Sequence, residues 1–193
     1  MIRVATEKDI SAILAIYGPY VRDTAASFEY SIPTEEEFLA RFCHHTHYCP
    51  WLVWEEQGYV TGYAYAMPAF SREAFSWCAE VSVYLAPQAQ GKGIGRRLYG
   101  ALEALLGELG YRVLYAVITD DNGVSLDFHR RMGYGICGRL ERCGVKFGRW
   151  WGVVRMEKRL NFVGIPTNKP KLWSEFVDND EIIQNILDNL SLS

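Results

Sequence analysis

The sequence lacks several features that would place it in a specialised class. Its longest apolar stretches, such as Trp51 to Trp54, are far shorter than the roughly 20 residues of a membrane span. The N-terminal residues contain no apolar leader segment. Neither sign of charge is in large excess, because 20 Lys and Arg stand against 23 Asp and Glu. We therefore expect neither a membrane nor a nucleic acid as the partner.

Cysteines are few, and nothing in their spacing suggests a disulfide framework. There are five of them, an odd number, and no secretory leader accompanies them. This pattern predicts reduced thiols in a cytoplasmic protein. A chain of 193 residues that is 49% hydrophobic and 22% charged is long enough to bury a core without disulfides.

Charge is distributed unevenly along the chain. Residues 161–193 hold five acidic residues and two lysines, whereas residues 1–160 hold equal numbers of each sign. This change predicts one domain over residues 1–160, followed by an acidic tail. Helical spacing of apolar residues predicts a short amphipathic helix in the tail, which packs on the body or on a partner subunit. Its apolar face comprises Ile182, Ile183, Ile186, Leu187 and Leu190.

Hydrophobic periodicity predicts a mixed α/β (α+β) fold. Strands are expected at residues 2–5, 51–55, 59–67, 80–85, 111–118, 134–140 and 151–157. Helices are expected at residues 10–21, 34–42, 96–109 and 124–132, and capping-box patterns open the first two. Hairpin-linked strands in the first half and strand–helix–strand units in the second half indicate a mixed sheet.

The segment 90–97 is rich in glycine, follows a predicted strand and opens a predicted helix. Closely spaced glycines let backbone amides approach a phosphate, and a helix N-terminus favours negative charge. A Walker A loop is excluded because Gly93 follows Lys92, and a dinucleotide fingerprint is excluded because Arg96 or Leu98 replaces its third glycine. The pattern predicts a pyrophosphate-binding loop, with a merely flexible loop as the alternative.

Several short motifs occur in a consistent order between about residue 2 and residue 160. They are Ser27-Phe28-Glu29, Gly62 to Ala66, Glu80 to Tyr84, Gln90-x-x-Gly93-x-Gly95, Asn122 with Ser125 and His129, and Lys146 to Trp150. Together they resemble the GNAT superfamily of N-acetyltransferases, and within it the phosphinothricin and methionine sulfoximine acetyltransferase branch.

The resemblance implies a V-shaped mixed sheet with helices on both faces, split between strands 80–85 and 111–118. It also implies direct acetyl transfer from acetyl-CoA to a primary amine in a ternary complex, a homodimer and no metal. The strand backbone at Val83, Tyr84 and Leu85 would pair with pantetheine, and Asn122 would hold the cofactor arm. The pyrophosphate would lie in the turn formed by Gln90, Gly91, Lys92, Gly93, Ile94, Gly95 and Arg96.

Two residues are candidates for acid–base chemistry. Glu80 shares a strand face with Ser82 and Tyr84, and in an apolar cleft its carboxylate would accept a proton from the amine, directly or through water. His129 stands where the superfamily often has a tyrosine, and it would protonate the leaving sulfur or relay a proton. The alternative for His129 is a histidine that only packs within its helix.

The resemblance also suggests an acceptor pocket. Arg72 would anchor a carboxylate or phosphinate, and the alternative is a solvated arginine paired with Glu73. Phe70 stands where a lysine is expected and Phe75 where a tyrosine is expected, so fewer polar contacts are predicted. The proposed lining residues are Phe28, Glu29, Phe75 and Trp77.

Two other chemistries are weaker hypotheses. The window Cys43 to Cys49 holds three histidines and two thiols, but it lacks metal-ligand spacing and is expected to be a polar loop between a helix and a strand. An acetylated Cys78 is disfavoured because no histidine is adjacent in sequence.

The sequence thus predicts an N-acetyltransferase acting on the α-amine of a small amino acid or analogue, of the methionine sulfoximine, methionine sulfone or phosphinothricin type, in detoxification. The alternatives are a different amine (a protein N-terminus, a polyamine or an aminoglycoside) or a non-catalytic acyl-CoA sensor.

Overall fold

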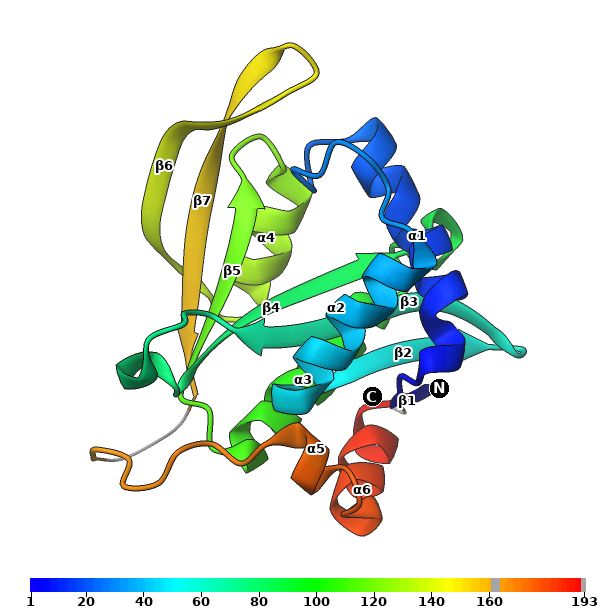
Figure 1. The fold of residues 1–193 in the computed structure, drawn as a ribbon, viewed down its shortest axis with the longest axis vertical. Coiled ribbons are helices and arrows are strands. Elements are labelled where there is room, and N and C mark those ends of the chain that lie inside the picture. Colours follow the sequence, from blue (N-terminus) through cyan, green and yellow to red (C-terminus); the bar gives the residue numbers. More distant parts are fainter. Residues whose placement is uncertain (161–163, 192–193) are drawn as a thin grey trace.

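The computed structural model describes residues 1–160 and 164–191, and within them seven strands form one sheet in the order β1-β2-β3-β4-β5-β7-β6 (Figure 1). The strands are β1 (Ile2–Val4), β2 (Trp51–Glu56), β3 (Tyr59–Pro68), β4 (Cys78–Leu85), β5 (Val113–Thr119), β6 (Gly135–Lys146) and β7 (Arg149–Arg159). The α-helices are α1 (Ile10–Asp23), α2 (Glu35–Tyr48), α3 (Ile94–Leu109), α4 (Gly123–Arg131), α5 (Trp173–Phe176) and α6 (Asp180–Ser191). Short 3-10 turns lie at η1 (Glu7–Asp9), η2 (Glu73–Phe75) and η3 (Pro87–Ala89).

Local sequence signals account for several element boundaries. At the start of α2, the Thr34 hydroxyl accepts a hydrogen bond from the Glu37 amide, and the Glu37 carboxylate accepts one from the Thr34 amide. Gln57 and Gly58 join β2 to β3 with φ angles of 53° and 81°, as a two-residue hairpin turn requires. Both predicted boundaries are confirmed.

Several predicted boundaries differ from the structure. The helix α2 continues to Tyr48, since no glycine or proline interrupts residues 35–49, so the histidine window lies on a helix and not in a loop. The helix α3 begins at Ile94 rather than at residue 96. The strands β6 and β7 are longer than predicted, because both faces of β6 are largely exposed and hydrophobic alternation fades along it.

Helices cover both faces of the sheet, as predicted. Trp51, Val53 and Tyr63 pack against α1 and α2, whereas Leu52 and Ala64, which alternate with them, pack against α3. In Figure 1, α1 and α2 lie on the near side of the sheet and α3 on the far side.

The sheet splits between β4 and β5. These strands are parallel and pair only over Cys78–Glu80 and Val113–Tyr115, after which they diverge (Figure 1). The expected V-shaped opening is therefore present, and it begins directly after Glu80.

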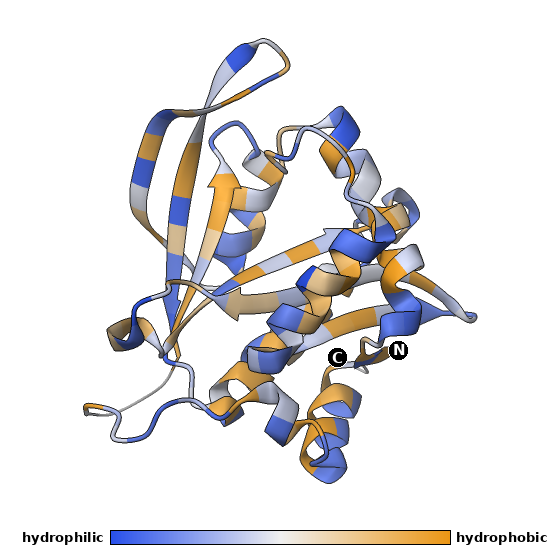
Figure 2. Cartoon of the chain, viewed as in Figure 1, coloured by the Kyte–Doolittle hydropathy of each residue, from blue (hydrophilic) through white to orange (hydrophobic). Residues whose placement is uncertain are grey.

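The C-terminal segment packs on the body. The α6 helix lies against α3 and β1, and Ile183 and Leu187 are buried as expected, whereas Ile182, which was predicted to share their apolar face, is 43% exposed. Figure 2 shows hydrophobic and hydrophilic residues interspersed along α6. None of the helices among the described residues is long and apolar enough to cross a bilayer. The side chains that the segment adds to the central core are Trp173, Phe176, Ile183 and Leu187.

Candidate active site

The glycine-rich segment forms a turn that exposes backbone amides at the start of α3. Gly91 and Gly93 have φ angles of 74° and 77°, which disfavour any residue with a side chain, and Gly93 is the N-cap. The Arg97 amide bonds the Gly93 carbonyl at 3.2 Å. The amides of the first turn, residues 94–96, therefore have no acceptor within the helix, and together they suit a phosphate.

Gly95 serves helix packing. A Cβ at Gly95 would lie 3.4 Å from the Leu85 side chain and 3.7 Å from the Phe128 ring. The absence of a side chain thus lets α3 approach both β4 and α4 closely. Ile94 is buried beneath the turn, while Lys92 and Arg96 are exposed at its mouth.

Beyond Glu80, β4 presents an unpaired backbone edge to the split. At the start of β5, the amides of Arg112 and Val113 donate to the Trp77 carbonyl at 2.8 and 3.1 Å. On the opposite side, the Ala69 amide, just after β3, donates to the Cys78 carbonyl at 3.1 Å. Because successive carbonyls of a strand point to opposite edges, those of Val81, Val83 and Leu85 face the split.

Two tyrosines occupy part of this edge. The Tyr99 hydroxyl lies 3.3 Å from the Val81 carbonyl, and the Tyr20 hydroxyl donates to the Leu85 carbonyl at 2.7 Å. The N–H and C=O of Val83 are directed between them into the split. A backbone amide pair at this position can bind an extended, amide-containing chain as another strand would.

The remaining predicted cofactor residues have structural partners. Gln90 donates from Nε2 to the Tyr20 hydroxyl at 3.3 Å, so it shapes the turn through a residue that sequence reasoning missed. The Tyr84 backbone is directed toward β3, and its ring stacks on Tyr63 with centroids 5.3 Å apart. Asn122 caps α4, where its Oδ1 accepts a bond from the Ser125 amide at 3.1 Å.

Glu80 lies on β4 at the point where the strands separate. Its side chain is half-buried, and among the described residues no group donates a hydrogen bond to its carboxylate. Burial raises the pKa of Glu80, and the positive charge of Arg155 opposes part of that rise. A carboxylate with a raised pKa and free oxygens is suited to accept a proton.

His129 lies on α4 and is 4% exposed. Its Nε2 is 2.8 Å from the Tyr99 hydroxyl, and its Nδ1 is 2.8 Å from the Ser125 carbonyl. A carbonyl only accepts, so Nδ1 carries the proton and, in the neutral ring, Nε2 accepts from Tyr99. Burial lowers the pKa of His129, which favours this neutral form. Both ring nitrogens are thus engaged within the protein.

Phe28 and Glu29 lie in the connection between α1 and α2, beside the β6–β7 hairpin. The Phe28 ring packs directly on Gly144, where a Cβ would come within 2.6 Å of it. Glu29 forms an ion pair with Arg41 of α2 at 2.7 Å. Lys146, 2% exposed, donates to three carbonyls of residues 21–27 at 2.6 to 2.8 Å and fixes this connection to the hairpin.

The connection between β3 and β4 carries Arg72, Phe75 and Trp77. The Arg72 side chain is exposed, and it does not pair with Glu73, which instead forms an ion pair with Lys169 of the C-terminal segment. The Trp77 indole donates from Nε1 to the Asn168 carbonyl at 3.0 Å. The C-terminal segment therefore contacts the connection that the sequence assigns to acceptor binding.

Sequence reasoning missed two residues that the fold brings beside Glu80. Tyr115 of β5 is paired directly with Glu80, and the guanidinium of Arg155 on β7 lies 5.3 Å from the ring centroids of both Tyr115 and Phe70. Phe75 contacts Phe70 with ring centroids 4.7 Å apart. Arg155 stands between the buried residues Val154 and Met156 of β7. A charged residue at such a position was the sequence signal that could have identified it as functional.

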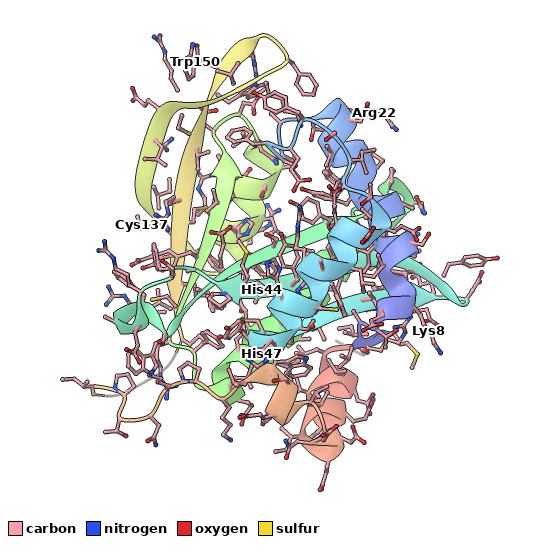
Figure 3. The ribbon with its side chains drawn as sticks, in the orientation of Figure 1. Lys8, Arg22, His44, His47, Cys137 and Trp150 are labelled. Carbon is pink, nitrogen blue, oxygen red and sulfur yellow. The ribbon has the colours of Figure 1, made fainter. Side chains whose placement is uncertain are left out.

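The weaker hypotheses gain no support from the geometry. His44 and His47 lie on α2 (Figure 3), and no cluster of three or more potential metal ligands occurs among residues 1–160 and 164–191. Burial raises the pKa of the Cys78 thiol, which disfavours the thiolate that an acyl-cysteine route needs.

An open strand edge that leads to an amide-rich turn, with a carboxylate at the start of that edge to which no described residue donates a hydrogen bond, suits a phosphorylated, amide-containing cofactor and a candidate base. A family model described as an acetyltransferase (GNAT) domain matches residues 2–154. The chain therefore belongs to the GNAT acetyltransferases, and it is an acyltransferase that binds acetyl-CoA.

Individual relatives agree with this assignment. A phosphinothricin N-acetyltransferase from Alcaligenes faecalis is 40% identical over 162 residues, covering 83% of this chain and 82% of that protein. An L-methionine sulfoximine/L-methionine sulfone acetyltransferase from Salmonella typhimurium is 35% identical over 161 residues, covering 83% and 94%. The crystal structure of a GNAT superfamily phosphinothricin acetyltransferase from Sinorhizobium meliloti with acetyl-CoA has a TM-score of 0.80 at 35% identity, covering 89% of this chain and 92% of that one.

Proposed function

We propose that this protein acetylates the α-amine of a small amino acid or amino acid analogue, of the methionine sulfoximine, methionine sulfone or phosphinothricin type. The observation that carries the proposal is Glu80, a half-buried carboxylate to which no described residue donates a hydrogen bond, at the point where β4 and β5 separate and the open edge of β4 begins. The names of the relatives at 35–40% identity support this class of acceptor.

In this proposal the residues of the split have separate roles. Acetyl-CoA supplies the acyl group as a thioester. The turn at residues 91–96 holds the pyrophosphate, and Val83 fixes the pantetheine arm through its backbone, with Gln90 and Asn122 keeping the turn and α4 in place. Glu80 takes a proton from the ammonium group of the acceptor, directly or through water, so that the amine becomes a nucleophile. Amide formation releases a second proton, which balances the protonation of the departing thiolate.

His129 has a supporting role in this proposal. Its neutral ring accepts from the Tyr99 hydroxyl and so orients that hydroxyl beside the β4 edge. Burial opposes the imidazolium that direct protonation of the thiolate would need, so His129 is a positioning residue rather than the acid.

The test is acetyl-CoA-dependent thiol release with a panel of primary amines. We expect turnover with L-methionine sulfoximine, L-methionine sulfone or phosphinothricin, and in Arg72→Ala a higher KM for the acceptor with little change in the KM for acetyl-CoA. Turnover only with a polyamine, an aminoglycoside or a peptide N-terminus would replace the acceptor class. Acetyl-CoA binding without turnover of any amine would favour an acyl-CoA sensor.

We also propose that the protein is a homodimer formed through the β6–β7 hairpin. The hairpin stands away from the body, and Trp150 lies at its tip (Figures 1 and 3). Several apolar side chains of this hairpin are exposed, and its strand β6 forms the edge of the sheet. Exposed apolar side chains at a sheet edge mark an interaction surface. Light scattering should give twice the mass of the chain, and Trp150→Glu should reduce it. The exposed side chains are Ile136, Leu140, Val145, Phe147 and Trp150.

We propose that the cellular role is detoxification of amino acid analogues. We also propose a cytoplasmic location, since the five free cysteines suit a reducing compartment. We place the acetyltransferase domain at residues 1–160, since the family model ends at residue 154, and treat residues 161–193 as an added acidic tail.

A further inference from the structure

Arg155 is a cation on the acceptor side of the split, and it forms no ion pair with any residue that the structure describes. It lies on β7, paired with Val117 of β5, and its guanidinium reaches back across Tyr115 toward Phe70. Its Nε atom is buried and has no hydrogen-bond partner among the described residues. A buried N–H group in this state has lost water without gaining an acceptor, which is costly unless a ligand supplies one.

The charged and titratable neighbours leave this guanidinium unneutralised. Glu157, two residues along β7, forms an ion pair with Arg159 instead. Glu80 is affected by the charge of Arg155, but the two side chains form no ion pair. The other titratable groups around it are Tyr115 and Cys137, and burial keeps both in their neutral forms.

The aromatic rings fix the orientation of the guanidinium. The guanidinium lies 5.3 Å from the centroids of both Phe70 and Tyr115, whose planes are 80° apart, so contacts from two directions confine it while its N–H groups have no protein acceptor among the described residues. Phe70 suggested an acceptor pocket with fewer polar contacts. Arg155 changes that expectation, because it supplies a cation to the same pocket from a different strand.

We propose that Arg155 binds the α-carboxylate of the acceptor through its guanidinium edge, a deepening of the proposed function on which it rests. The α-carboxylate is attached to the same carbon as the reacting amine, so the cation nearest Glu80 is the one suited to hold it. Arg72, which is exposed on the β3–β4 connection, then binds the side-chain group of the acceptor. The acceptor class narrows to α-amino acids with a free carboxylate.

The experiment compares L-methionine sulfone with its α-carboxamide in the wild-type enzyme, Arg155→Met and Arg155→Lys. Loss of a charge-assisted bidentate contact should raise the KM for the acid about tenfold to hundredfold in Arg155→Met, with the KM for acetyl-CoA unchanged. The preference for the acid over the amide should fall by the same factor. Arg155→Lys should restore part of that preference.

The control is Arg159→Met on the same strand, whose side chain is 73% exposed and pairs with Glu157. It removes the same charge from a solvent-exposed position. We therefore expect the acid-to-amide preference to stay unchanged. If Arg155→Met lowers kcat/KM equally for acid and amide, Arg155 has a structural role and the inference is wrong while the proposed function stands. If the wild-type enzyme acetylates other amines but no α-amino acid, the proposed function and this inference both fail.

Discussion

Two acid–base groups in opposite states, Glu80 of β4 and His129 of α4, lie on opposite sides of β4. On the face toward α1 and α2, Glu80 is half-buried, unpartnered and raised in pKa. On the face toward α3 and α4, His129 is fully buried and both its ring nitrogens are hydrogen-bonded. Burial acts on both groups by disfavouring the charged form, but only one of them keeps free lone pairs.

This difference separates a group that can exchange protons from one that fixes a geometry. A general base needs an open position for the incoming proton, and Glu80 has one at the split. A neutral, doubly bonded imidazole instead fixes its neighbours, because a movement of the ring breaks two hydrogen bonds at once. The same strand thus separates a reactive side from a supporting side.

Substituting Glu80 by Gln should produce the largest effect. The amide keeps the shape of the side chain but cannot accept a proton at neutral pH, so kcat/KM should fall by about 10²–10⁴-fold. The acid limb of the pH–rate profile should disappear with it. Steady-state kinetics against pH provide the measurement, and unchanged acetyl-CoA binding by calorimetry is the control. A loss below threefold would remove Glu80 from the reactive side.

His129→Phe should cost stability more than activity. It leaves the Tyr99 hydroxyl and the Ser125 carbonyl without their partner, so unfolding free energy should fall by about 1–3 kcal/mol. Activity should fall less than tenfold. Urea denaturation and kinetics of the same preparations measure both quantities.

A double-mutant cycle sharpens the interpretation of His129. Tyr99→Phe removes the same hydrogen bond from the other side, so the stability losses of the two single variants should not add in the double variant. A loss of activity in His129→Phe as large as that in Glu80→Gln would instead make His129 a proton donor, and the two faces would then share the chemistry.

The fold was predictable to the extent that local patterns determine it. Alternation along residues 80–85 placed Glu80 and Val81 on opposite faces, and the glycine spacing located the turn before α3. Prediction failed where the pattern is weak. Both faces of β6 are exposed and its register shifts between Leu140 and Gly144, so hydrophobic alternation does not mark its end.

The site was predictable residue by residue only where a motif named the residue. Arg155 and Tyr115 were missed, because they reach Glu80 through strand order, and β7 lies beside β5 only in the folded sheet. The Glu73–Lys169 pair was missed for a similar reason, since 96 positions separate its members. Contacts between distant segments follow from packing, which periodicity alone does not encode.

The smallest expected effect is a pH dependence of stability that differs in sign between the two faces. The folded-state pKa of Glu80 is raised above 4.5, so its contribution to stability is complete below that pH and is lost as pH rises through the folded-state value. The folded-state pKa of His129 is lowered below 6.5, so its contribution is complete above pH 6.5 and is lost as pH falls through the folded-state value.

Two variants convert this into a measurement. From pH 5 to pH 8, Glu80→Gln should become more stable relative to the wild-type protein, because it removes a charge that the fold disfavours. Over the same interval His129→Phe should become less stable relative to the wild-type protein. The wild-type protein gains stability as pH rises, because His129 is then neutral in the unfolded state as it is in the folded state. Urea midpoints at the two pH values test both trends. Trends of the same sign would mean that burial does not disfavour the charged form of both groups, and the states assigned to Glu80 and His129 would be wrong.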